Sequence, residues 1–335
     1  MRLSPQQTSK SAAHTHARPN SRTPIYAVKI GISAITSELS LTSALLGDNF
    51  TAHCGNAVAC LSARLSDSSL SVQQFSARLP GVCLAILAFA YVFDIANQAF
   101  SVEEDSLNKP HRPIPSGIMS MEGGYTRWLL SWILFPILLH LTVGFQATTF
   151  LVLWEVWVLL FYVWPKFNNW AARNLFTAVG AVLQLSLLEA LLTDLNLPSM
   201  EESSLRWLLF SWLVTTIHVQ EFHDMDGDRK AGRQTLPLVL DQRGQFWLRG
   251  ATATLIACTA ISNGLRVDYA TVSLEPALLL LGLCHLLSML TVAVRLVKLP
   301  FKEADKVTYK YYYTLATYTM LHFHVCAARR LWAIE

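Results

Sequence analysis

Apolar residues are gathered into long runs along this chain, and polar residues are concentrated between the runs. After residue 80, eight runs approach the roughly 20 apolar residues that a helix needs to cross a bilayer. They are Val82–Asn97, Trp128–Val143, Phe145–Val163, Asn174–Leu192, Leu205–Glu221, Phe246–Ile261, Leu274–Val297 and Tyr311–Cys326. The pattern therefore predicts an all-α, polytopic membrane protein.

The first 80 residues follow this pattern poorly. Residues 1–24 are rich in Ser, Thr, Gln, Pro, Arg and His and predict a disordered cytosolic tail, with a transit peptide as the weaker reading. Residues 25–80 are diluted by small residues and interrupted by Glu38, Asp48, Asn49 and His53. One crossing helix near Ile30–Leu46 brings the total to about nine. Residues 25–335 are then one transmembrane domain, in which residues 25–80 stay poorly defined.

Composition supports the membrane class. Hydrophobic residues make up 53% of the 335 residues, charged residues make up 15%, and the mean hydropathy is +0.36. The chain is therefore too apolar for an ordinary soluble domain. The six cysteines show neither a CxxC pair nor metal-type spacing, so the sequence indicates no disulfide framework and no zinc site.

Basic residues are unequally divided between the two sets of loops. If the predicted spans alternate through the bilayer, fourteen Lys and Arg residues fall on one side and six on the other. The richer side carries Lys109, Arg112, Arg127, Lys166, Arg173, Arg229, Lys230, Arg233, Arg243, Arg249, Lys298, Lys302, Lys306 and Lys310, and the poorer side carries Arg64, Arg78, Arg206, Arg266, Arg329 and Arg330. Since cytosolic loops carry the excess of positive charge, the richer side is predicted to face the cytosol.

A first acidic cluster lies on that side, in Asn97–Gly117, which reads NQAFSVEEDSLNKPHRPIPSG. On a continuous helix, Asn97, Ser101 and Asp105 are spaced i, i+4 and i+8, and Glu104 returns to within about 20° of Asn97. Four oxygen-bearing side chains are therefore predicted on one face, close to the membrane boundary, where ionisable groups are usually functional. The alternative is an ordinary helix end followed by a solvated charged loop.

A second acidic cluster lies in His218–Pro237, which reads HVQEFHDMDGDRKAGRQTLP. On a helical wheel, Glu221, Asp224 and Asp228 fall within an arc of roughly 60°, whereas Asp226 points to the opposite face. Carboxylates this close repel one another unless a cation lies among them. A solvated acidic loop is the alternative. The same order of acids followed by bases occurs in both clusters, and this repetition favours a two-part magnesium site.

Acids followed by bases suit a magnesium-bridged diphosphate. Mg²⁺ is usually held by one or two carboxylates together with substrate phosphates and water, and Lys or Arg can bind the remaining phosphate oxygens. The candidate metal ligands are Asn97, Glu104, Asp105, Glu221, Asp224 and Asp228. The candidate substrate-binding cations are Lys109, Arg112, Lys166 and Arg229, although anchoring at the membrane interface is an equal alternative for Lys166.

The two clusters together resemble those of the UbiA superfamily of intramembrane prenyltransferases. That family has nine transmembrane helices and two Asp-rich motifs, of the forms NDxxDxxxD and DxxGDxxxGxxTLP. Here NQAFSVEED followed by NKPHRPIPSG matches the first motif and its continuation, and DMDGDRKAGRQTLP matches the second. The resemblance covers about residue 82 to the C-terminus. It implies metal-binding, catalytic roles for Asn97, Asp105, Asp224 and Asp228, and a central cavity open towards the cytosolic side.

The first motif departs from the family pattern at two positions. Ser101 stands where the family has the central Asp, and Gln98 stands where it has the Asp after Asn. Glu104, on the face predicted for Asn97, is placed to compensate for the missing carboxylate. This variant motif is similar to that of fungal members, including the branch of membrane-bound terpene cyclases of the bergamotene synthase type.

The resemblance implies a Mg²⁺-dependent enzyme that ionises a prenyl diphosphate. We favour a terpene cyclase, a carbon-oxygen lyase that converts farnesyl diphosphate to a sesquiterpene and releases diphosphate. The alternative is a prenyltransferase that moves the chain onto an aromatic or other acceptor. A transporter is a weaker reading, because its carboxylates would be expected near the bilayer midplane. The expected location is the endoplasmic reticulum membrane with a cytosol-facing site. The lipid bilayer is the expected surrounding, and no nucleic acid or obligate protein partner is indicated.

Overall fold

The computed structural model describes residues 23–66, 71–192, 199–265 and 276–332. The chain divides into two compact units, residues 1–43 and residues 44–335. In the first unit, residues 23–43 belong to the helix α1, Thr23–Leu46. The predicted disordered tail falls almost entirely outside the described residues.

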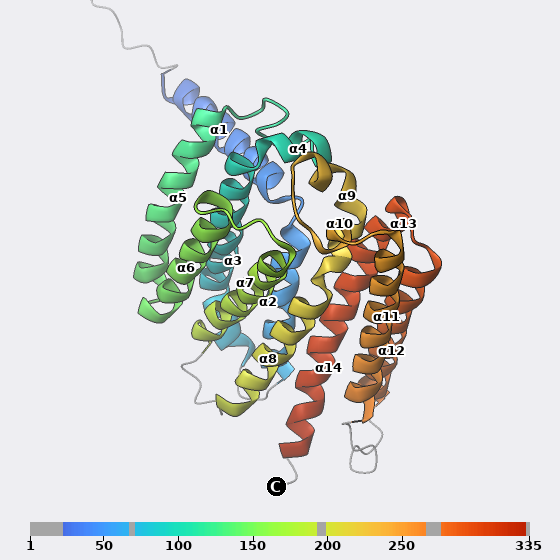
Figure 1. Ribbon diagram of the computed structural model, residues 1–335. Helices are drawn as coiled ribbons and strands as arrows, with labels where there is room; N and C mark the ends of the chain where they lie inside the picture. Colours follow the sequence, from blue (N-terminus) through green and yellow to red (C-terminus); the bar gives the residue numbers. More distant parts are fainter. Residues whose placement is uncertain (1–22, 67–70, 193–198, 266–275, 333–335) are drawn as a thin grey trace, which may run out of the picture. The chain divides into compact units, whose positions relative to one another are not determined.

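Helices and loops make up all the described residues, so the all-α prediction is confirmed for them (Figure 1). The N-terminal half of the second unit contains α2 Phe50–Ser66, α3 Val72–Phe100, α4 Val102–Asn108, α5 Met121–Thr142, α6 Phe145–Val158, η1 Leu159–Val163 and α7 Trp170–Ala190. The C-terminal half contains α8 Ser199–Thr216, η3 Ile217–Gln220, α9 Glu221–Lys230, α10 Leu236–Val239, α11 Gln242–Leu265, α12 Pro276–Lys298, α13 Lys302–Val307, η4 Thr308–Tyr313 and α14 Thr314–Trp332.

The eight predicted apolar spans after residue 80 all fall on helices, in order, on α3, α5, α6 with η1, α7, α8 with η3, α11, α12 and η4 with α14. Among the described residues, four helical segments are long and apolar enough to cross a membrane: Val72–Phe100, Phe145–Val163, Trp170–Ala190 and Pro276–Lys298. The apolar pattern therefore predicts the positions of the helices well. Fewer of these helices meet the stricter requirement for length and hydropathy that defines a candidate membrane span.

The helix predicted near residues 30–46 is present as part of α1, whereas a second helix between residues 25 and 65 was not predicted. Two helices occur there, α1 and α2, and the chain turns between them at residues 47–49. Helix α2 packs against α3, α7 and α14 inside the second unit (Figure 1). Its small and polar residues weaken the hydropathy signal. They are also what allows neighbouring helices to come close, because a Cβ at Gly55 would overlap the Tyr318 ring of α14.

Polar caps fix where three of the long helices begin. The Ser71 hydroxyl accepts a hydrogen bond from the Gln74 amide at 3.2 Å, and the Gln74 side chain accepts one from the Ser71 amide at 2.9 Å, which completes a capping box for α3. Ser120 caps α5 and Asn169 caps α7 through their side-chain oxygens. These caps set the register of the helices that surround the cavity described below.

Candidate active site

A cavity of about 700 Å³ lies within the second unit, between α2, α3, α6, α7 and α9. This volume is within the range of roughly 300–1,000 Å³ that is usual for small-molecule sites. Along α7 the lining passes from Arg173 in the first turn to Gln184. At 1.5 Å per residue these two positions are about 16 Å apart along the helix. The cavity is therefore long enough to hold an elongated ligand.

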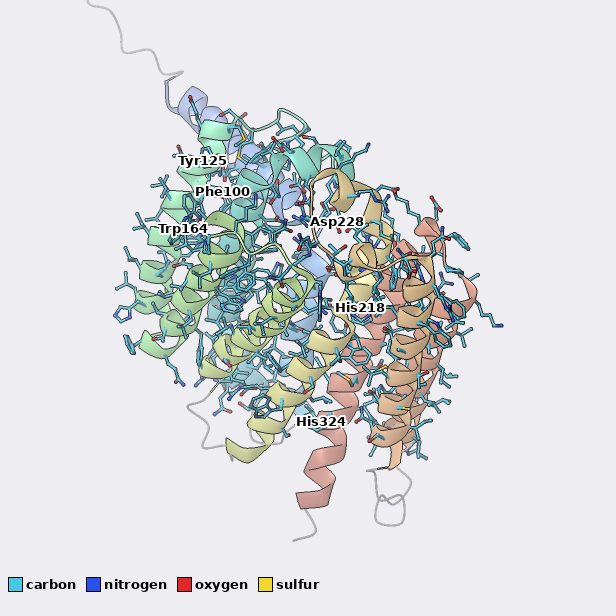
Figure 2. The ribbon with its side chains drawn as sticks, viewed as in Figure 1. Phe100, Tyr125, Trp164, His218, Asp228 and His324 are labelled. Atoms are coloured by element: carbon cyan, nitrogen blue, oxygen red, sulfur yellow. The ribbon has the colours of Figure 1, made fainter. Side chains whose placement is uncertain are left out.

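One part of the lining is charged and is called the charged end; it consists of Glu103, Glu104, Lys166, Arg173, Glu221 and Arg233. Phe100 and Tyr125, with ring centroids 5.4 Å apart, lie close to this end, where α3 finishes and α5 begins (Figure 2). Lys166 reaches across from the loop before α7, since its Nζ donates to the Phe100 carbonyl at 2.7 Å. Cations and anions from distant parts of the chain therefore meet at one end of the cavity.

The other part, the aromatic end, consists of Phe89, Phe93, Trp154, Phe161, Tyr162 and Phe176. Phe89 and Trp154 are stacked, with centroids 4.5 Å apart and planes at 5°. Phe93 contacts Trp154, Tyr162 and Phe176 at centroid distances of 5.3 to 5.7 Å. Gly180 leaves room for this packing, since a Cβ there would approach Trp154 to 2.6 Å. Faces of aromatic rings attract cations, most strongly where water is excluded.

The first acidic cluster does not lie on a continuous helix, and this part of the prediction is wrong. Helix α3 ends at Phe100, α4 begins at Val102, and Ser101 between them has a non-helical backbone, with φ −131° and ψ 31°. The i, i+4, i+8 spacing from Asn97 to Asp105 therefore crosses a bend. The bend turns α4 so that it contacts α9, and it brings the two acidic clusters together (Figure 1).

Asp105 is neutralised by a buried arginine. The Arg112 Nη1 donates to both Asp105 carboxylate oxygens at 2.8 and 2.9 Å, and the Arg112 Nε donates to Asp48 at 2.9 Å. Arg112 is 1% exposed. Burial raises the pKa of Asp105, although Arg112 opposes that shift. Arg112 therefore serves first as the partner of two carboxylates, one of them in the turn before α2.

The second cluster lies on α9, and its side chains point where the helical wheel predicts. Glu221 and Asp228 are buried, Asp224 is partly exposed, and Asp226 is exposed and paired with Lys302 at 2.9 Å. Figure 2 shows Asp228 on α9. Close packing of α9 on α4 depends on glycine here, because a Cβ at Gly227 would meet the Asn108 side chain at 1.7 Å.

Arg233 joins the two clusters. Its guanidinium forms an ion pair with Glu104 of α4 and a second one, at 3.5 Å, with Asp228 of α9. Glu221 is paired with Arg173 of α7 at 3.1 Å and accepts a hydrogen bond from the Leu236 amide at 3.1 Å. Helices α4, α7 and α9 are thus tied through charged groups at the charged end.

The predicted site residues are distributed unevenly around the cavity. Glu104, Glu221 and Lys166 line it, whereas Asn97, Asp105, Asp224, Asp228, Lys109, Arg112 and Arg229 are not among the described lining residues. Lys109 lies among the acids of both clusters: burial and Arg112 lower its pKa, while Asp224 and Asp105 oppose the shift. Arg229 is exposed. Among the described residues, Arg173 and Arg233 are the arginines that line the cavity.

The residues fit a magnesium ion that is shared with a substrate. Within the described part of the chain, no three His, Cys, Asp or Glu side chains are grouped closely enough to hold a metal on their own. Both carboxylate oxygens of Asp228 are nevertheless buried without a hydrogen-bond partner among the described residues. Burial raises the pKa of Asp228 to about 7, with Asp224 and Glu221 adding to the effect and Arg173 opposing it. A cation beside Asp228 would favour its ionised form, and phosphates and water can complete such a site.

Sequence reasoning missed the contribution of α2 and of one acid inside α3. Asn49, His53 and Asn56 line the cavity, and Asp94, which is fully buried, accepts a hydrogen bond from Asn49 at 2.5 Å. Of the polar residues that interrupt this stretch of the sequence, Asn49 and His53 face the cavity, whereas Asp48 pairs with Arg112. Asp94 could have been identified from the sequence, because an acid within an apolar run is usually functional.

Long apolar helices around a cavity that is charged at one end and aromatic at the other define a membrane-type helical bundle with a site for an amphiphilic ligand. The chain belongs to the UbiA prenyltransferase family, whose sequence profile matches residues 57–318. The resemblance drawn from the two motifs is therefore confirmed, and with it the membrane-integral class.

Relatives include both enzymes named as transferases and enzymes named as cyclases or synthases. The chain is 33% identical over 186 residues to the polyprenyl transferase eriF of Hericium erinaceus, which covers 52% of this chain and 60% of the relative. It is 32% identical over 196 residues to the somaliensene A/B synthase of Streptomyces somaliensis, with coverage of 58% and 61%. It is 28% identical over 173 residues to the fumagillin beta-trans-bergamotene synthase of Aspergillus fumigatus, with coverage of 50% and 56%. The chain thus matches about three fifths of the length of each relative.

A solved structure shares the fold. It is described as giving structural and mechanistic insights into the biosynthesis of digeranylgeranylglyceryl phosphate synthase in membranes. The TM-score is 0.58, the sequence identity is 19%, and the match covers 87% of this chain and 99% of that chain. At this identity the likeness establishes the fold alone.

Proposed function

We propose that this protein ionises a prenyl diphosphate and cyclises the chain, with farnesyl diphosphate as substrate and a sesquiterpene and diphosphate as products. The observation that carries the proposal is the continuous cavity with one charged and one aromatic end. A diphosphate needs charge-assisted donors and cations, whereas an allylic cation is stabilised by aromatic faces away from water. The two ends match the two halves of the substrate.

At the charged end, Lys166, Arg173 and Arg233 line the cavity and are placed to bind diphosphate oxygens. Lys109, Arg112 and Arg229 would complete the cationic surroundings, with Arg112 acting through its ion pair to Asp105. These cations stabilise the negative charge that develops on the leaving group as the allylic C–O bond breaks.

Oxygen-bearing side chains of both clusters would hold magnesium at the same end: the amide of Asn97 and the carboxylates of Glu104, Asp105, Glu221, Asp224 and Asp228. Bound there, Mg²⁺ would neutralise the leaving diphosphate as a Lewis acid. Asp228 is the strongest of these candidates, because its oxygens are buried and have no hydrogen-bond donor within the described residues. Asp224 and Glu221 share its face of α9.

At the aromatic end, Phe93, Trp154 and Phe176 surround the position that the chain would occupy. They would stabilise successive positive charges and exclude water, which would otherwise trap the cation as an alcohol. The substrate's own double bonds can then attack the cation. A ring forms only if the chain is held folded, and the packed rings provide a shape that can do this.

The alternative is transfer of the prenyl chain to an acceptor, and one of the relatives is named as such a transferase. Both reactions use the same ionisation and differ in what consumes the cation. We favour cyclisation, because the aromatic end is lined by rings on α3, α6, η1 and α7, an arrangement suited to a hydrocarbon product.

We further propose nine membrane crossings, by α2, α3, α5, α6 with η1, α7, α8, α11, α12 and α14. This assignment replaces the crossing predicted at residues 30–46 with α2, which packs within the bundle. The excess of Lys and Arg supports a cytosolic charged end. The endoplasmic reticulum remains the proposed membrane.

Membranes that contain the protein test the proposed activity directly. They are incubated with Mg²⁺ and with geranyl, farnesyl or geranylgeranyl diphosphate, without acceptor, and released diphosphate and extractable hydrocarbon are measured. We expect both products from farnesyl diphosphate, and neither from membranes that carry Asp228→Asn. Release only after a phenolic or quinone-type acceptor is added would establish transfer, and no release under either condition would contradict both readings.

A further inference from the structure

We propose that His53 accepts the proton that ends the carbocation reaction, and that Asp94 positions it. This inference rests on the proposed function and deepens it. Formation of a hydrocarbon must finish by the loss of a proton from carbon, so a base is required beside the aromatic end. The residues of α2 and α3 that meet there supply one.

His53 lies beside the aromatic end of the cavity. It lines the cavity, and its ring lies edge-on to Phe89 and Phe93, with centroids 6.0 and 6.3 Å apart. Phe89 and Phe93 both contact Trp154. A cation held against these rings would therefore be formed next to the imidazole.

Asp94 gives the imidazole a specific partner. Its Oδ2 lies 3.8 Å from His53 Nε2, and neither atom has a hydrogen bond to any described residue. Asn49 donates to the other oxygen, Oδ1, at 2.5 Å and holds the carboxylate in place. Asp94 is 0% exposed within an apolar helix, where an acid is costly unless it has a role. A carboxylate beside an imidazole orients the ring and stabilises the imidazolium once a proton arrives.

Neighbouring amide side chains hold the backbone of His53 in place, and they do not compete with its imidazole as proton acceptors. The Gln184 Nε2 donates to the His53 carbonyl at 2.8 Å, and the Gln184 Oε1 accepts from Asn56 at 2.9 Å. Amides are not bases at neutral pH. Among the described lining residues, the other side chains with basic or acidic groups are the ion-paired or exposed groups towards the charged end and three tyrosines. His53 is the imidazole among them.

Loss of diphosphate leaves an allylic cation, and attack by a double bond of the chain moves the positive charge to another carbon. A C–H bond on the neighbouring carbon then breaks, its electron pair forms a C=C bond, and the proton binds to a ring nitrogen of His53. The product is a neutral hydrocarbon, and the imidazolium beside Asp94 later returns the proton to water.

The test compares ionisation with termination in His53→Gln. Glutamine is similar in size to histidine and can still form hydrogen bonds, but it cannot act as a base. Diphosphate release should remain within about tenfold of wild type, because ionisation precedes the lost step. Formation of the native hydrocarbon should fall about 10²-fold, the usual scale for loss of a general base, and alcohols or other olefins should replace it.

Asp94→Asn distinguishes positioning from a structural role. It should change the product mixture in the same direction as His53→Gln, and the double variant should add little, since the two residues act as one unit. A merely structural defect would lower all products together and leave their ratio unchanged. If His53→Gln does not accumulate in membranes, Asp94→Asn carries the test.

The control is His285→Gln, which changes another buried histidine that stacks on Phe323 and is not part of the cavity lining. Its product ratio should match wild type. The proposal is overturned if His53→Gln yields the native hydrocarbon at the wild-type rate, or if diphosphate release and hydrocarbon fall by the same factor in a folded protein. If wild-type membranes release no diphosphate without an acceptor, the cyclase function itself fails, and that result is distinct from either of these.

Discussion

The charged end and the aromatic end of the cavity are built on opposite principles. At the charged end, two acidic residues of the lining have arginine partners: Glu104 pairs with Arg233 and Glu221 with Arg173. At the aromatic end, the rings pack on one another, and the polar groups come from His53, Asn56 and Gln184. In the proposed reaction, ionisation would therefore take place at one end of the cavity and cyclisation at the other. A cation kept away from water at the aromatic end could react with its own chain.

The largest effect is expected for Asp228→Asn. The change keeps the shape but removes a buried charge proposed to bind magnesium, so diphosphate release and hydrocarbon formation should fall together by at least about a hundredfold, the scale on which groups that stabilise transition-state charge act. Both rates are measured at saturating Mg²⁺ in membranes with matched protein content. Loss of hydrocarbon formation alone would show that Asp228 does not act in the ionisation step. It would also contradict the proposed difference in function between the two ends.

A smaller effect, roughly tenfold, is expected for Glu104→Gln, because a charge-assisted link between α4 and the loop after α9 becomes a neutral one. The substrate dependence of the initial rate measures it. Ser101→Asp is the companion variant. If Glu104 already does the work of the missing family carboxylate, another acid adds repulsion and should not raise the rate. A faster Ser101→Asp enzyme would contradict this compensation.

At the aromatic end, Phe93→Leu should change the products more than the ionisation rate. Removing one cation–π contact of about 1 kcal/mol slows the reaction roughly fivefold, and the altered shape should redistribute the hydrocarbons. Gas chromatography of the extract measures the ratio. Phe246→Leu, which changes an exposed ring outside this cavity, serves as the control. An unchanged hydrocarbon ratio in Phe93→Leu would show that the cation does not reach these rings.

The smallest effect is expected for Asp226→Asn, less than about twofold, because Asp226 is exposed and its bond to Lys302 is a surface salt bridge of little energetic value. Asp226 and Asp228 lie on the same helix, α9. Comparing the two variants therefore distinguishes an effect of side-chain orientation from an effect of acidic charge alone. Equal losses in Asp226→Asn and Asp228→Asn, measured as diphosphate release, would contradict the orientation of α9.

Much of the fold was predictable from local pattern. Hydropathy located eight helices, and helical periodicity correctly turned Asp226 away from Asp228. The break at Ser101 was not predictable, because the i, i+4 spacing of its neighbours reads as one continuous helix. Helix α2 was missed because residues such as Gly55 and His53, which serve close packing and the cavity, lower its hydropathy.

The partners of the acids could not be read from the sequence either. Glu104 and Arg233 are far apart in the sequence, and they meet only because α4 bends back onto α9. The two clusters predicted the kind of chemistry and the end of the bundle at which it would occur. Which cations reach the cavity depends on the three-dimensional arrangement. Two of those that line it, Arg173 and Arg233, are not among the substrate-binding cations predicted from the sequence.

The most direct test of the separation between the two ends is a paired assay of diphosphate release and hydrocarbon formation from farnesyl diphosphate. It is run on wild type, Asp228→Asn and Phe93→Leu membranes, with Mg²⁺ and without acceptor. We expect equal molar amounts of both products in wild type, a parallel loss of both in Asp228→Asn, and a changed hydrocarbon ratio with diphosphate release reduced only about fivefold in Phe93→Leu. Parallel loss of both products in both variants, with an unchanged hydrocarbon ratio, would contradict the account.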